Sequence, residues 1–247
     1  MHNAAFQELG IDAAYLAFDV PPSDLAAALA GMRALGIRQL AVSIPHKLAV
    51  MALLDEVNET ARQIGAVNTI TQEGGRLVGT NTDWQGAIAA LERQAGADLS
   101  GSRAIVLGAG GAARAAVFGL VRQGASVVIL NRTASKAADL AAALGAASAG
   151  PLTDLAALDY DVLVNTTSVG LREDASPIPE SSIREGSIVM DAVYDPAETR
   201  LLREAKRRGA QTVAGKWWLV YQAAGQLEAW TQRPAPIHVM ARAFDDA

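Results

Sequence analysis

Residues 104–133 read AIVLGAGGAARAAVFGLVRQGASVVILNRT, and this stretch decides the fold of the chain around it. A short apolar run, Ala104 to Leu107, leads into a glycine-rich turn and a helical pattern. A second apolar run follows, from Ser126 to Leu130. This order predicts a strand, a helix and a parallel strand, with the fingerprint G-x-G-x-x-A at the first turn. The sequence therefore predicts a Rossmann-type βαβ unit that binds a dinucleotide.

The small residues of the turn have separate roles in such a unit. Gly108 permits the tight turn from strand to helix, and Gly110 lets the backbone approach a pyrophosphate. Ala113 is small enough for the helix to lie close to the strand. The pyrophosphate would meet free N–H groups where the helix begins, near Gly111. We therefore expect the cofactor to contact Gly108, Ala109, Gly110, Gly111 and Ala112.

The end of the second strand indicates which dinucleotide is bound. Units that bind NAD usually carry Asp or Glu about 20 residues after the first glycine, where it holds the ribose 2′-hydroxyl. Here the matching position offers Asn131 and Arg132, with Thr133 beside them and Lys136 one turn later. A guanidinium pairs with a 2′-phosphate, whereas a carboxylate would repel it. NADP is therefore the predicted cofactor; the alternative is a surface turn with one solvated arginine.

The amino-acid composition limits which classes of protein this chain can belong to. The 247 residues are 51% hydrophobic and 19% charged, which is typical of a globular protein. The net charge of −5 argues against a nucleic-acid groove, because such a groove needs a basic face. With no cysteine and three scattered histidines, we expect no metal site. Since no apolar stretch reaches membrane-spanning length and no signal peptide opens the chain, we expect a cytoplasmic protein without membrane partners.

Strand and helix patterns alternate along the whole chain, which predicts an α/β fold with two domains. A substrate domain is predicted over residues 1–98, with residues 220–247 packing back on it. A Rossmann domain is predicted over residues 99–219, and the segment Gly96–Gly101 is the expected seam.

The patterns also predict individual elements. In the first domain these are strands at Tyr15–Val20 and Leu40–Ile44, helices at 24–35, Val50–Ile64 and Trp84–Gln94, and a hairpin of Val67–Thr71 and Arg76–Thr80. In the rest of the chain they are strands at Val162–Asn165, Ile188–Ala192 and Gln211–Val213, and helices at Thr199–Arg208, Val220–Trp230 and His238–Phe244.

Two segments place reactive side chains just beyond predicted strands. Lys47 follows a strand that Pro45 stops, and Asn81 and Asp83 follow the next hairpin and precede a helix. Ligands of α/β proteins gather beyond the carboxyl ends of strands, so both segments are candidates for one crevice. Lys47 would act as a general acid or base if burial or coupling to Asp83 lowered its pKa. The alternative is an exposed lysine and an aspartate that caps the helix.

Two amides stand in apolar surroundings. Asn68 lies inside an apolar strand pattern, and Gln222 lies on an otherwise apolar helix. Each needs a hydrogen-bond partner, which is either a ligand or another group of the protein. The sequence leaves open whether they bind a substrate or are satisfied core residues.

Read together, these segments resemble the shikimate dehydrogenase family. The resemblance rests on nine segments in the family's order: His2–Phe6, Ser43–Lys47, Ile64–Thr69, Gly79–Gly86, Gly108–Arg114, Asn131–Thr133, Asn165–Gly170, Asp191–Pro196 and Tyr221-Gln222. Each segment alone is weak, but nine in the right order are specific.

The resemblance implies an NADP-dependent oxidoreductase that interconverts shikimate and 3-dehydroshikimate, on the route through chorismate to aromatic amino acids. Lys47 matches the catalytic lysine of the family, and Asp83 matches the aspartate paired with it. The residues implied at the substrate are Ser43, Asn68, Asn81, Tyr194 and Gln222. Besides the glycine-rich turn and residues 131–136, those implied at the cofactor are Thr166, Val193, Gly215 and Trp218. A small-molecule substrate and a monomer or homodimer are expected.

The sequence departs from the family pattern in three places, one of which is Ala41 and Ser43, where the family usually has Asn or Ser at the first position and Thr at the second. The family normally carries Ser-x-Ser-Pro just before the His-Asn pair, and this sequence begins at Met1-His2-Asn3. We expect a lost carboxylate contact and an exposed sheet edge. Gly215–Leu219 also replaces a pattern that normally ends in methionine against the nicotinamide, so Trp218 is expected to stack there or to narrow the pocket. The alternatives are therefore a paralogue that acts on quinate or another hydroxy-cyclohexane carboxylate, and a weakly active or non-catalytic nucleotide-binding relative.

Overall fold

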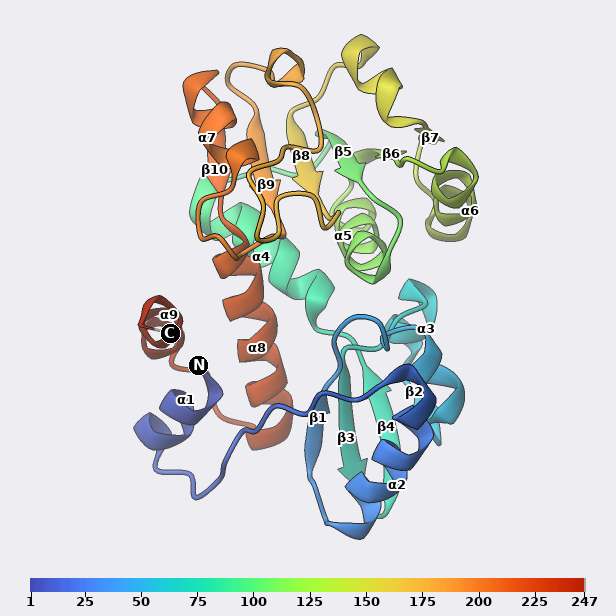
Figure 1. The fold of residues 1–247 in the computed structure, drawn as a ribbon, viewed down its shortest axis with the longest axis vertical. Helices are drawn as coiled ribbons and strands as arrows, with labels where there is room; N and C mark the ends of the chain where they lie inside the picture. The colour runs from blue at the N-terminus through green and yellow to red at the C-terminus, as the bar shows by residue number, and fades with distance from the viewer. Residues whose placement is uncertain (247) are drawn as a thin grey trace. The chain divides into compact units, whose positions relative to one another are not determined.

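The computed structural model describes residues 1–246, and the chain divides into two compact units (Figure 1). Unit 1 joins both ends of the chain, Met1–Thr82 and Gln222–Ala247, and unit 2 is Asp83–Tyr221. Both units combine helices and strands, which confirms the predicted α/β class with a Rossmann-type parallel sheet. No helix among the described residues is long and apolar enough to cross a membrane.

The boundary between the units differs from the predicted one at residue 98. Helix α4 (Asp83–Ala95) belongs to unit 2 because it packs on α5 (Gly111–Arg122). A Cβ atom at Gly119 of α5 would lie 2.8 Å from the Ile88 side chain of α4, so the absence of a side chain lets the two helices approach closely. The return to unit 1 begins at Gln222, close to the predicted residue 220.

Unit 2 is built on six parallel strands in the order β10-β9-β8-β5-β6-β7 (Figure 1). The strands are β5 (Arg103–Leu107), β6 (Ser126–Leu130), β7 (Ser148–Gly150), β8 (Val162–Asn165), β9 (Ile188–Asp191) and β10 (Gln211–Val213). Its other helices are α6 (Ala134–Leu144), α7 (Arg200–Arg207) and the first part of α8 (Gly215–Thr231), with short 3-10 turns at Leu152–Ala157 and Glu180–Ser182. All five strands predicted in this region are present; β7 and α6 had not been predicted.

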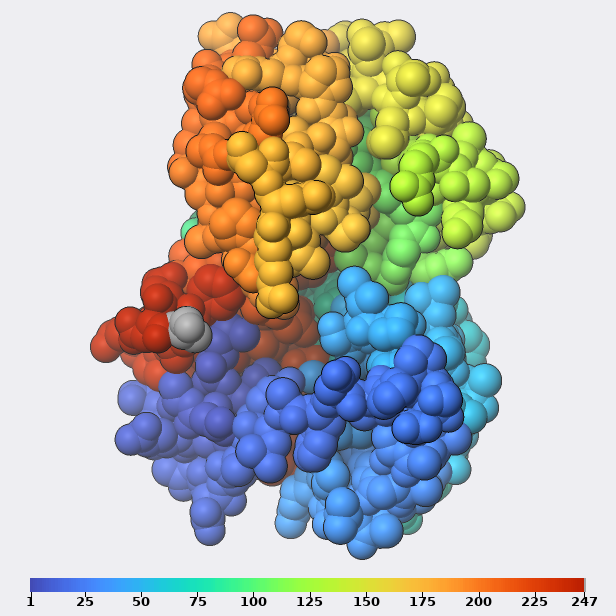
Figure 2. Space-filling model, viewed as in Figure 1, coloured from blue at the N-terminus to red at the C-terminus, as the bar shows by residue number. Residues whose placement is uncertain are grey.

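Both faces of this sheet are buried, as expected for parallel strands connected by helices. Val106 of β5 packs with α4 and α5 on one face, while its neighbour Ile105 packs with α7 on the other. The segment between β8 and β9, yellow-orange in Figure 2, lies on the surface of the unit. The sheet itself is the core of unit 2.

Unit 1 is built on a smaller mixed sheet in the order β1-β3-β4-β2. The strands are β1 (Gln39–Ala41), β2 (Glu56–Val57), β3 (Thr69–Glu73) and β4 (Arg76–Thr80). The predicted hairpin is present: β3 and β4 are antiparallel, and Gly74 and Gly75 both have positive φ, 55° and 82°, as a type I′ turn requires. Helix α2 (Leu25–Ala34) follows a 3-10 turn (Pro22–Asp24) and packs its Leu29 and Met32 against the sheet.

The remaining helices of unit 1 are α1 (His2–Leu9), α3 (Glu59–Ile64), the second part of α8 and α9 (Ile237–Asp245). Helix α1 contacts α9, and the ring of Phe6 meets that of Trp230 edge-on, with centroids 5.4 Å apart. The two ends of the chain therefore meet in this unit.

Two predicted elements of unit 1 were wrong. Within residues 1–246, the segment 15–20 pairs with no strand and belongs to neither sheet. The helix predicted over 50–64 is a 3-10 turn (Ala49–Leu53), strand β2 and helix α3. Asp55 interrupts it by accepting the N–H of Leu77 at 2.6 Å, and Asn58 begins α3 by accepting the N–H of Ala61 at 2.8 Å. Side chains that bond to backbone in this way end helices.

Candidate functional site

Asn68 is the centre of a buried polar cluster in unit 1. It is 1% exposed and immediately precedes β3. Its Oδ1 accepts the N–H of Thr82 and the hydroxyl of Thr69, both at 2.8 Å. Its Nδ2 donates to Oγ1 of Thr82 at 3.0 Å and to Oε1 of Gln222 at 3.2 Å. The structure therefore brings Asn68 and Gln222 together, and each is a partner of the other.

Thr82 and Gln226 belong to this cluster, and the sequence analysis missed both. Thr82 also donates its hydroxyl to the carbonyl oxygen of Gln222 at 2.9 Å. Gln226 is 2% exposed and donates Nε2 to the carbonyl oxygen of Asn68 and to Oγ1 of Thr69, both at 3.1 Å. The position of Gln226, four residues after Gln222 on one helix, was the available signal, because such residues share a helix face. These contacts fix the orientation of the Asn68 and Gln222 amides.

The turn after β1 is held against the same cluster. The N–H of Val42 donates to the carbonyl oxygen of Asn68 at 2.7 Å, and the N–H of Val67 donates to that of Lys47 at 2.8 Å. Lys47 is partly buried, while Ser43 in the same turn is exposed. The backbone of the lysine is thereby anchored next to Asn68.

Asn81 completes the predicted residues of unit 1. It is 4% exposed, follows β4, and donates Nδ2 to the carbonyl oxygen of Ala66 at 2.9 Å. The end of β1, the start of β3 and the end of β4 lie at one end of the sheet, since β3 is antiparallel to both neighbours. Five predicted residues therefore gather there: Ser43, Lys47, Asn68, Asn81 and Gln222.

Two predicted catalytic or substrate residues belong to unit 2. Asp83 is the first residue of α4, two positions after Asn81, and is 5% exposed. It lies inside the helix rather than before it, so it is not the residue that precedes α4 as a cap. Its carbonyl oxygen accepts the indole N–H of Trp218 at 2.9 Å. Tyr194 follows β9 and is 44% exposed.

The glycine-rich turn of unit 2 has the geometry that the fingerprint predicts. Gly108 has φ +113°, and a Cβ atom there would lie 2.6 Å from Oγ1 of Thr166. Only glycine fits this position. A Cβ atom at Gly110 would meet nothing within 4 Å, so the space beside the backbone at the start of α5 is open. A pyrophosphate needs this open space together with the helix N–H groups.

Hydrogen bonds connect the turns that follow the parallel strands to the neighbouring strands, along one edge of the sheet. The N–H of Gly108 donates to the carbonyl oxygen of Leu130 at 2.8 Å, and Oγ1 of Thr166 donates to that of Leu107 at 2.6 Å. The N–H of Asn131 donates to the carbonyl oxygen of Gly150 at 3.1 Å. The predicted cofactor residues Gly108, Asn131 and Thr166 therefore lie along the carboxyl edge of the sheet, where α/β proteins bind nucleotides.

The turn after β6 presents positive charge. Asn131 donates Nδ2 to the carbonyl oxygen of Thr133 at 3.0 Å, which shapes the turn. Arg132 and Lys136 are exposed, and neither pairs with a carboxylate among residues 1–246. Their charges remain available for a 2′-phosphate. Together with the open space at Gly110, the residues present fit NADP.

A buried aspartate supports two more predicted cofactor residues. Asp191 at the end of β9 is fully buried, and burial raises its pKa. Its Oδ1 accepts Nδ2 of Asn165 at 2.9 Å and the N–H of Val193 at 3.0 Å, and its Oδ2 accepts the hydroxyl of Thr199 at 2.7 Å. This network fixes the loops after β8 and β9, which carry Thr166 and Val193.

The structure does not support Trp218 as a residue that stacks on the nicotinamide. Its side chain is 5% exposed, packs in the apolar cluster of unit 2, and already uses its N–H on Asp83. Gly215, by contrast, has a close-packing role. A Cβ atom there would lie 2.4 Å from the carbonyl oxygen of Val193, so α8 can begin against this backbone only with a glycine.

The two units therefore offer different chemistry. Unit 1 presents a cluster of amides and hydroxyls and a lysine whose backbone is anchored next to it, which suits a polyhydroxylated small molecule and the transfer of a proton. Unit 2 presents an open phosphate cradle and free cationic groups, which suit a phosphorylated dinucleotide.

Comparison with known families covers most of the chain. The model described as shikimate dehydrogenase substrate binding domain matches residues 1–70, and the one described as shikimate / quinate 5-dehydrogenase matches residues 90–172. The model described as shikimate 5′-dehydrogenase C-terminal domain matches residues 219–243. The first match lies within unit 1, and the second lies within unit 2.

Individual relatives agree with these matches. A protein of Moorella thermoacetica named shikimate dehydrogenase (NADP(+)) is 46% identical over 261 residues, covering 100% of this chain and 88% of its own. The crystal structure of shikimate 5-dehydrogenase from Thermus thermophilus with NADP(H) and shikimate has a TM-score of 0.93 at 39% identity, covering 99% of this chain and 92% of that one. The ligand-free structure of 5-ketofructose reductase from Gluconobacter sp. strain CHM43 has a TM-score of 0.87 at 36% identity, covering 99% and 91%. The chain belongs to the shikimate dehydrogenase family.

Proposed function

We propose that this protein is an NADP-dependent shikimate dehydrogenase, which reversibly reduces 3-dehydroshikimate to shikimate. The observation that carries the proposal is the cluster of Asn68, Thr82 and Gln222 at the end of the sheet that also holds Lys47. Relatives 46% identical to the chain bear this name, and a similar structure contains both ligands. The expected partners are small molecules only, the expected location is the cytoplasm, and the expected assembly is a monomer or homodimer.

Each predicted catalytic or substrate residue has a role in this reaction. Asn68, Gln222 and Ser43 hydrogen-bond the ring hydroxyls and so select which carbon reacts. In the oxidation of shikimate, the amine of Lys47 accepts the proton of the reacting hydroxyl, and that carbon becomes a carbonyl as its hydride leaves. Asp83 assists this proton transfer, Asn81 holds the turn before Asp83, and Tyr194 serves the substrate carboxylate.

Unit 2 supplies the other reactant of the redox pair. When bound, NADP would take up the hydride in the oxidation and supply it in the reduction. The turn from Gly108 to Ala112 would hold the pyrophosphate, and Arg132 with Thr133 and Lys136 would hold the 2′-phosphate. Thr166, Val193 and Gly215 shape the edge that carries the nicotinamide.

Two alternatives keep the fold and change the activity. The first is a paralogue that acts on quinate or on another hydroxy-cyclohexane carboxylate. The likeness to 5-ketofructose reductase adds a ketose to the compounds that must be tested. The second is a nucleotide-binding relative with weak turnover or none.

The test is a matrix of initial rates. The purified chain is assayed with shikimate and quinate, each with NADP⁺ and NAD⁺, and with 5-ketofructose and NADPH in the reverse direction. Cofactor binding is followed in parallel as a shift of the melting temperature, Tm. We expect kcat/KM to be largest for shikimate with NADP⁺. A larger value for quinate or 5-ketofructose selects the paralogue, and an NADP-induced Tm shift without turnover selects the non-catalytic relative.

A further inference from the structure

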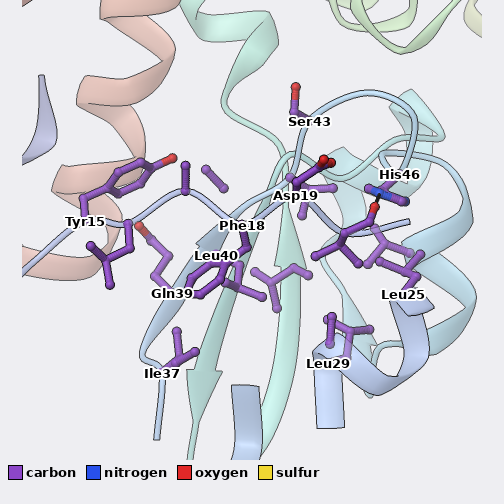
Figure 3. A pocket seen from close by; sticks show the side chains of 18 of the residues that line it. Tyr15, Phe18, Asp19, Leu25, Leu29, Ile37, Gln39, Leu40, Ser43 and His46 are labelled. Atoms are coloured by element: carbon purple, nitrogen blue, oxygen red, sulfur yellow. Dashed lines mark hydrogen bonds between the residues drawn. The ribbon is translucent and has the colours of Figure 1, made fainter. Parts of the chain in front are cut away.

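Gln226 of α8 is a buried side chain that bonds the start of the hairpin in unit 1. It is 2% exposed, and its Nε2 donates to the carbonyl oxygen of Asn68 and to Oγ1 of Thr69, both at 3.1 Å. The carbonyl oxygen of Gln226 accepts Nε2 of Gln39 of β1 at 3.1 Å. Gln39 lines a groove of about 410 Å³ beside β1, and Figure 3 shows its side chain there. Gln226 therefore ties α8 to both β1 and β3.

The orientation of the Gln226 amide follows from these neighbours. A carbonyl oxygen can only accept a hydrogen bond, so the end of the amide that faces that of Asn68 is the NH2 group. The reverse orientation would place two acceptors together. The other end, Oε1, is buried and has no hydrogen-bond partner within residues 1–246. A buried acceptor without a partner costs free energy, so the bonds from Nε2 are what a glutamine contributes at this position.

The donors of Gln226 set the direction of the hydrogen bonds that reach Asn68. Oγ1 of Thr69 accepts from Gln226, so its one proton is left for Oδ1 of Asn68, at 2.8 Å. The same Oδ1 accepts the N–H of Thr82 at 2.8 Å. The oxygen end of the Asn68 amide is thereby fixed, and its NH2 end faces the opposite way.

The same direction continues from Asn68 to Gln222. Nδ2 of Asn68 donates to Oε1 of Gln222 at 3.2 Å and to Oγ1 of Thr82 at 3.0 Å. The hydroxyl of Thr82 gives its proton to the carbonyl oxygen of Gln222 at 2.9 Å, so it meets Nδ2 as an acceptor. Oε1 of Gln222 thus faces Asn68, and the NH2 group of Gln222 is turned away from it. The chain of bonds leaves α8 at Gln226 and returns to it one turn earlier.

We propose that Gln226 is a positioning residue for the substrate-binding amides of Asn68 and Gln222. Acting through Thr69, it turns the NH2 group of Gln222 towards the substrate, so that a ring hydroxyl oxygen accepts a hydrogen bond there. A substrate with an oxygen at this place is thereby selected over one without it. The inference rests on the proposed function, in which the two amides hold the ring hydroxyls.

The first test removes the donors of Gln226. Gln226→Met keeps the length of the side chain and loses Nε2, while the carbonyl oxygen of Asn68 keeps the N–H of Val42 at 2.7 Å. The hydroxyl of Thr69 can then turn away from Oδ1 of Asn68. We expect kcat/KM for shikimate to fall about tenfold or more, because the amides no longer hold one orientation, and KM for NADP⁺ to stay unchanged. Gln7→Met, at an exposed glutamine of α1, is the matched control and should leave both constants unchanged.

The second test determines whether the effect passes through Thr69. This side chain is fully buried, and Thr69→Val replaces it by one of nearly the same shape without the hydroxyl. If Gln226 and Thr69 act in one chain, Gln226→Met lowers kcat/KM by less than about threefold when Thr69→Val is already present. The full tenfold loss in both backgrounds would show that Gln226 acts by another route, and would overturn the proposal.

The third test changes the substrate. Two analogues of shikimate are used, and each lacks one of the two ring hydroxyls that do not react. For the analogue without the hydroxyl that Gln222 holds, Gln226→Met should lower kcat/KM by less than about threefold, because that hydrogen bond is already absent. A role in stability alone would not depend on the substrate. A tenfold loss with both analogues would therefore overturn the proposal.

A second variant serves if Gln226→Met does not fold. Gln226→Glu keeps the shape of the side chain, but its carboxylate cannot donate, whereas the protonated acid can. Burial raises the pKa of a carboxyl, so the ratio of kcat/KM in the variant to that in the parent should rise as the pH falls from about 9 to about 6. His2, which bonds the backbone of Ala223 on the same helix, stays neutral over this range because burial lowers its pKa to about 4. A ratio that does not rise would overturn the proposal.

Failure of this proposal and failure of the proposed function give different results. If the parent chain turns over neither shikimate nor quinate, the proposed function fails, and the role of Gln226 fails with it. If the parent is active and Gln226→Met keeps its kcat/KM, only the positioning role fails. A lower Tm with unchanged kcat/KM would in that case make Gln226 a residue of the fold alone.

Discussion

The two sheets of this protein differ in how completely their strands pair with neighbouring strands. In unit 2, six parallel strands are covered by helices on both faces, and the central strands β5 and β8 pair on both sides. In unit 1, strand β1 pairs on one side only and borders a groove. All the strands predicted in unit 2 form, whereas the strand predicted at residues 15–20 of unit 1 does not. An extended sequence becomes a strand only where a neighbouring backbone is present to pair with it.

The candidate substrate residues and the candidate cofactor residues also lie mainly in different units. Unit 1 carries the lysine and the amides, and unit 2 carries the phosphate cradle and the free cations. Substitutions should therefore alter turnover and cofactor binding independently of each other. They should also distinguish the stability of the sheet in unit 2 from that of the sheet in unit 1, where β1 has one unpaired edge.

The largest effect is expected for Lys47→Ala. Loss of a general acid or base lowers turnover by about 10²- to 10⁴-fold, because no other group takes the proton in its place. The NADP-induced shift of Tm stays unchanged, since the cradle lies in the other unit. Steady-state rates and thermal melting measure both. The matched control is Lys206→Ala, which removes an exposed lysine paired with Glu198 and leaves turnover intact. Full activity of Lys47→Ala would remove the lysine from the mechanism.

The contrast between the sheets is tested by truncating one leucine in each. Leu163 of β8 is fully buried, so Leu163→Ala leaves a cavity and lowers the free energy of unfolding by about 2–5 kcal/mol. Leu16→Ala removes a side chain that is 66% exposed and costs less than about 0.5 kcal/mol. Urea unfolding of each variant measures the difference. If the two variants lost the same free energy of unfolding, Leu16, which lines the groove beside β1, would be buried in solution.

The cofactor preference is tested at Arg132. An ionic hydrogen bond to a phosphate contributes about 1.5–3 kcal/mol, so Arg132→Asp should weaken NADP binding about 10- to 10²-fold and leave NAD binding nearly unchanged. Fluorescence titration with each cofactor gives the two dissociation constants. The control Arg62→Asp removes an exposed arginine of unit 1 and should alter neither constant. If NADP and NAD weaken equally in Arg132→Asp, the arginine does not read the 2′-phosphate.

Local sequence patterns predicted an element correctly where the interactions that determine it lie close together in the sequence. The glycine-rich turn, the hairpin at Gly74-Gly75 and five of the six parallel strands were predicted correctly, because their turn residues and apolar periods lie within about 30 residues. The sequence also indicated that Asn68 needs a partner. It gave no means of choosing Gln222, which lies 154 residues away.

The errors arose where a distant backbone decides the local structure. Asp55 ends the predicted helix by bonding the N–H of Leu77, and this contact exists only once β4 has formed. Helix α4 belongs to unit 2 because Gly119 of α5 admits Ile88, which no pattern in either helix reveals. Trp218 could be placed at the cofactor or in the core by its sequence, and its burial together with the bond to Asp83 places it in the core.

The smallest effect concerns a feature that the two units share. Each has an aspartate that accepts both a backbone N–H and an arginine: Asp55 with Leu77 and Arg33, and Asp161 with the N–H and guanidinium of Arg103. These hydrogen bonds lower the pKa of both carboxyls, that of Asp161 from 3.8 to about 2. The unfolded chain then binds more protons than the folded one between these values, so stability falls as the pH drops from about 4 towards 2.

Replacing Asp161 by Asn should flatten this part of the acid unfolding profile. The contribution at neutral pH is about 1 kcal/mol or less, because the side chains of Arg103 and Asp161 are 48% and 47% exposed and solvent screens the pair. Asp55→Asn should produce the same change of shape in unit 1, and 1 M salt should weaken both effects. Thermal melting between pH 2 and 5 measures them. If the acid unfolding profile of Asp161→Asn kept the slope of the parent, the loss of stability in acid would arise from other carboxylates. The two aspartates would then share the geometry of their hydrogen bonds but no effect on acid stability.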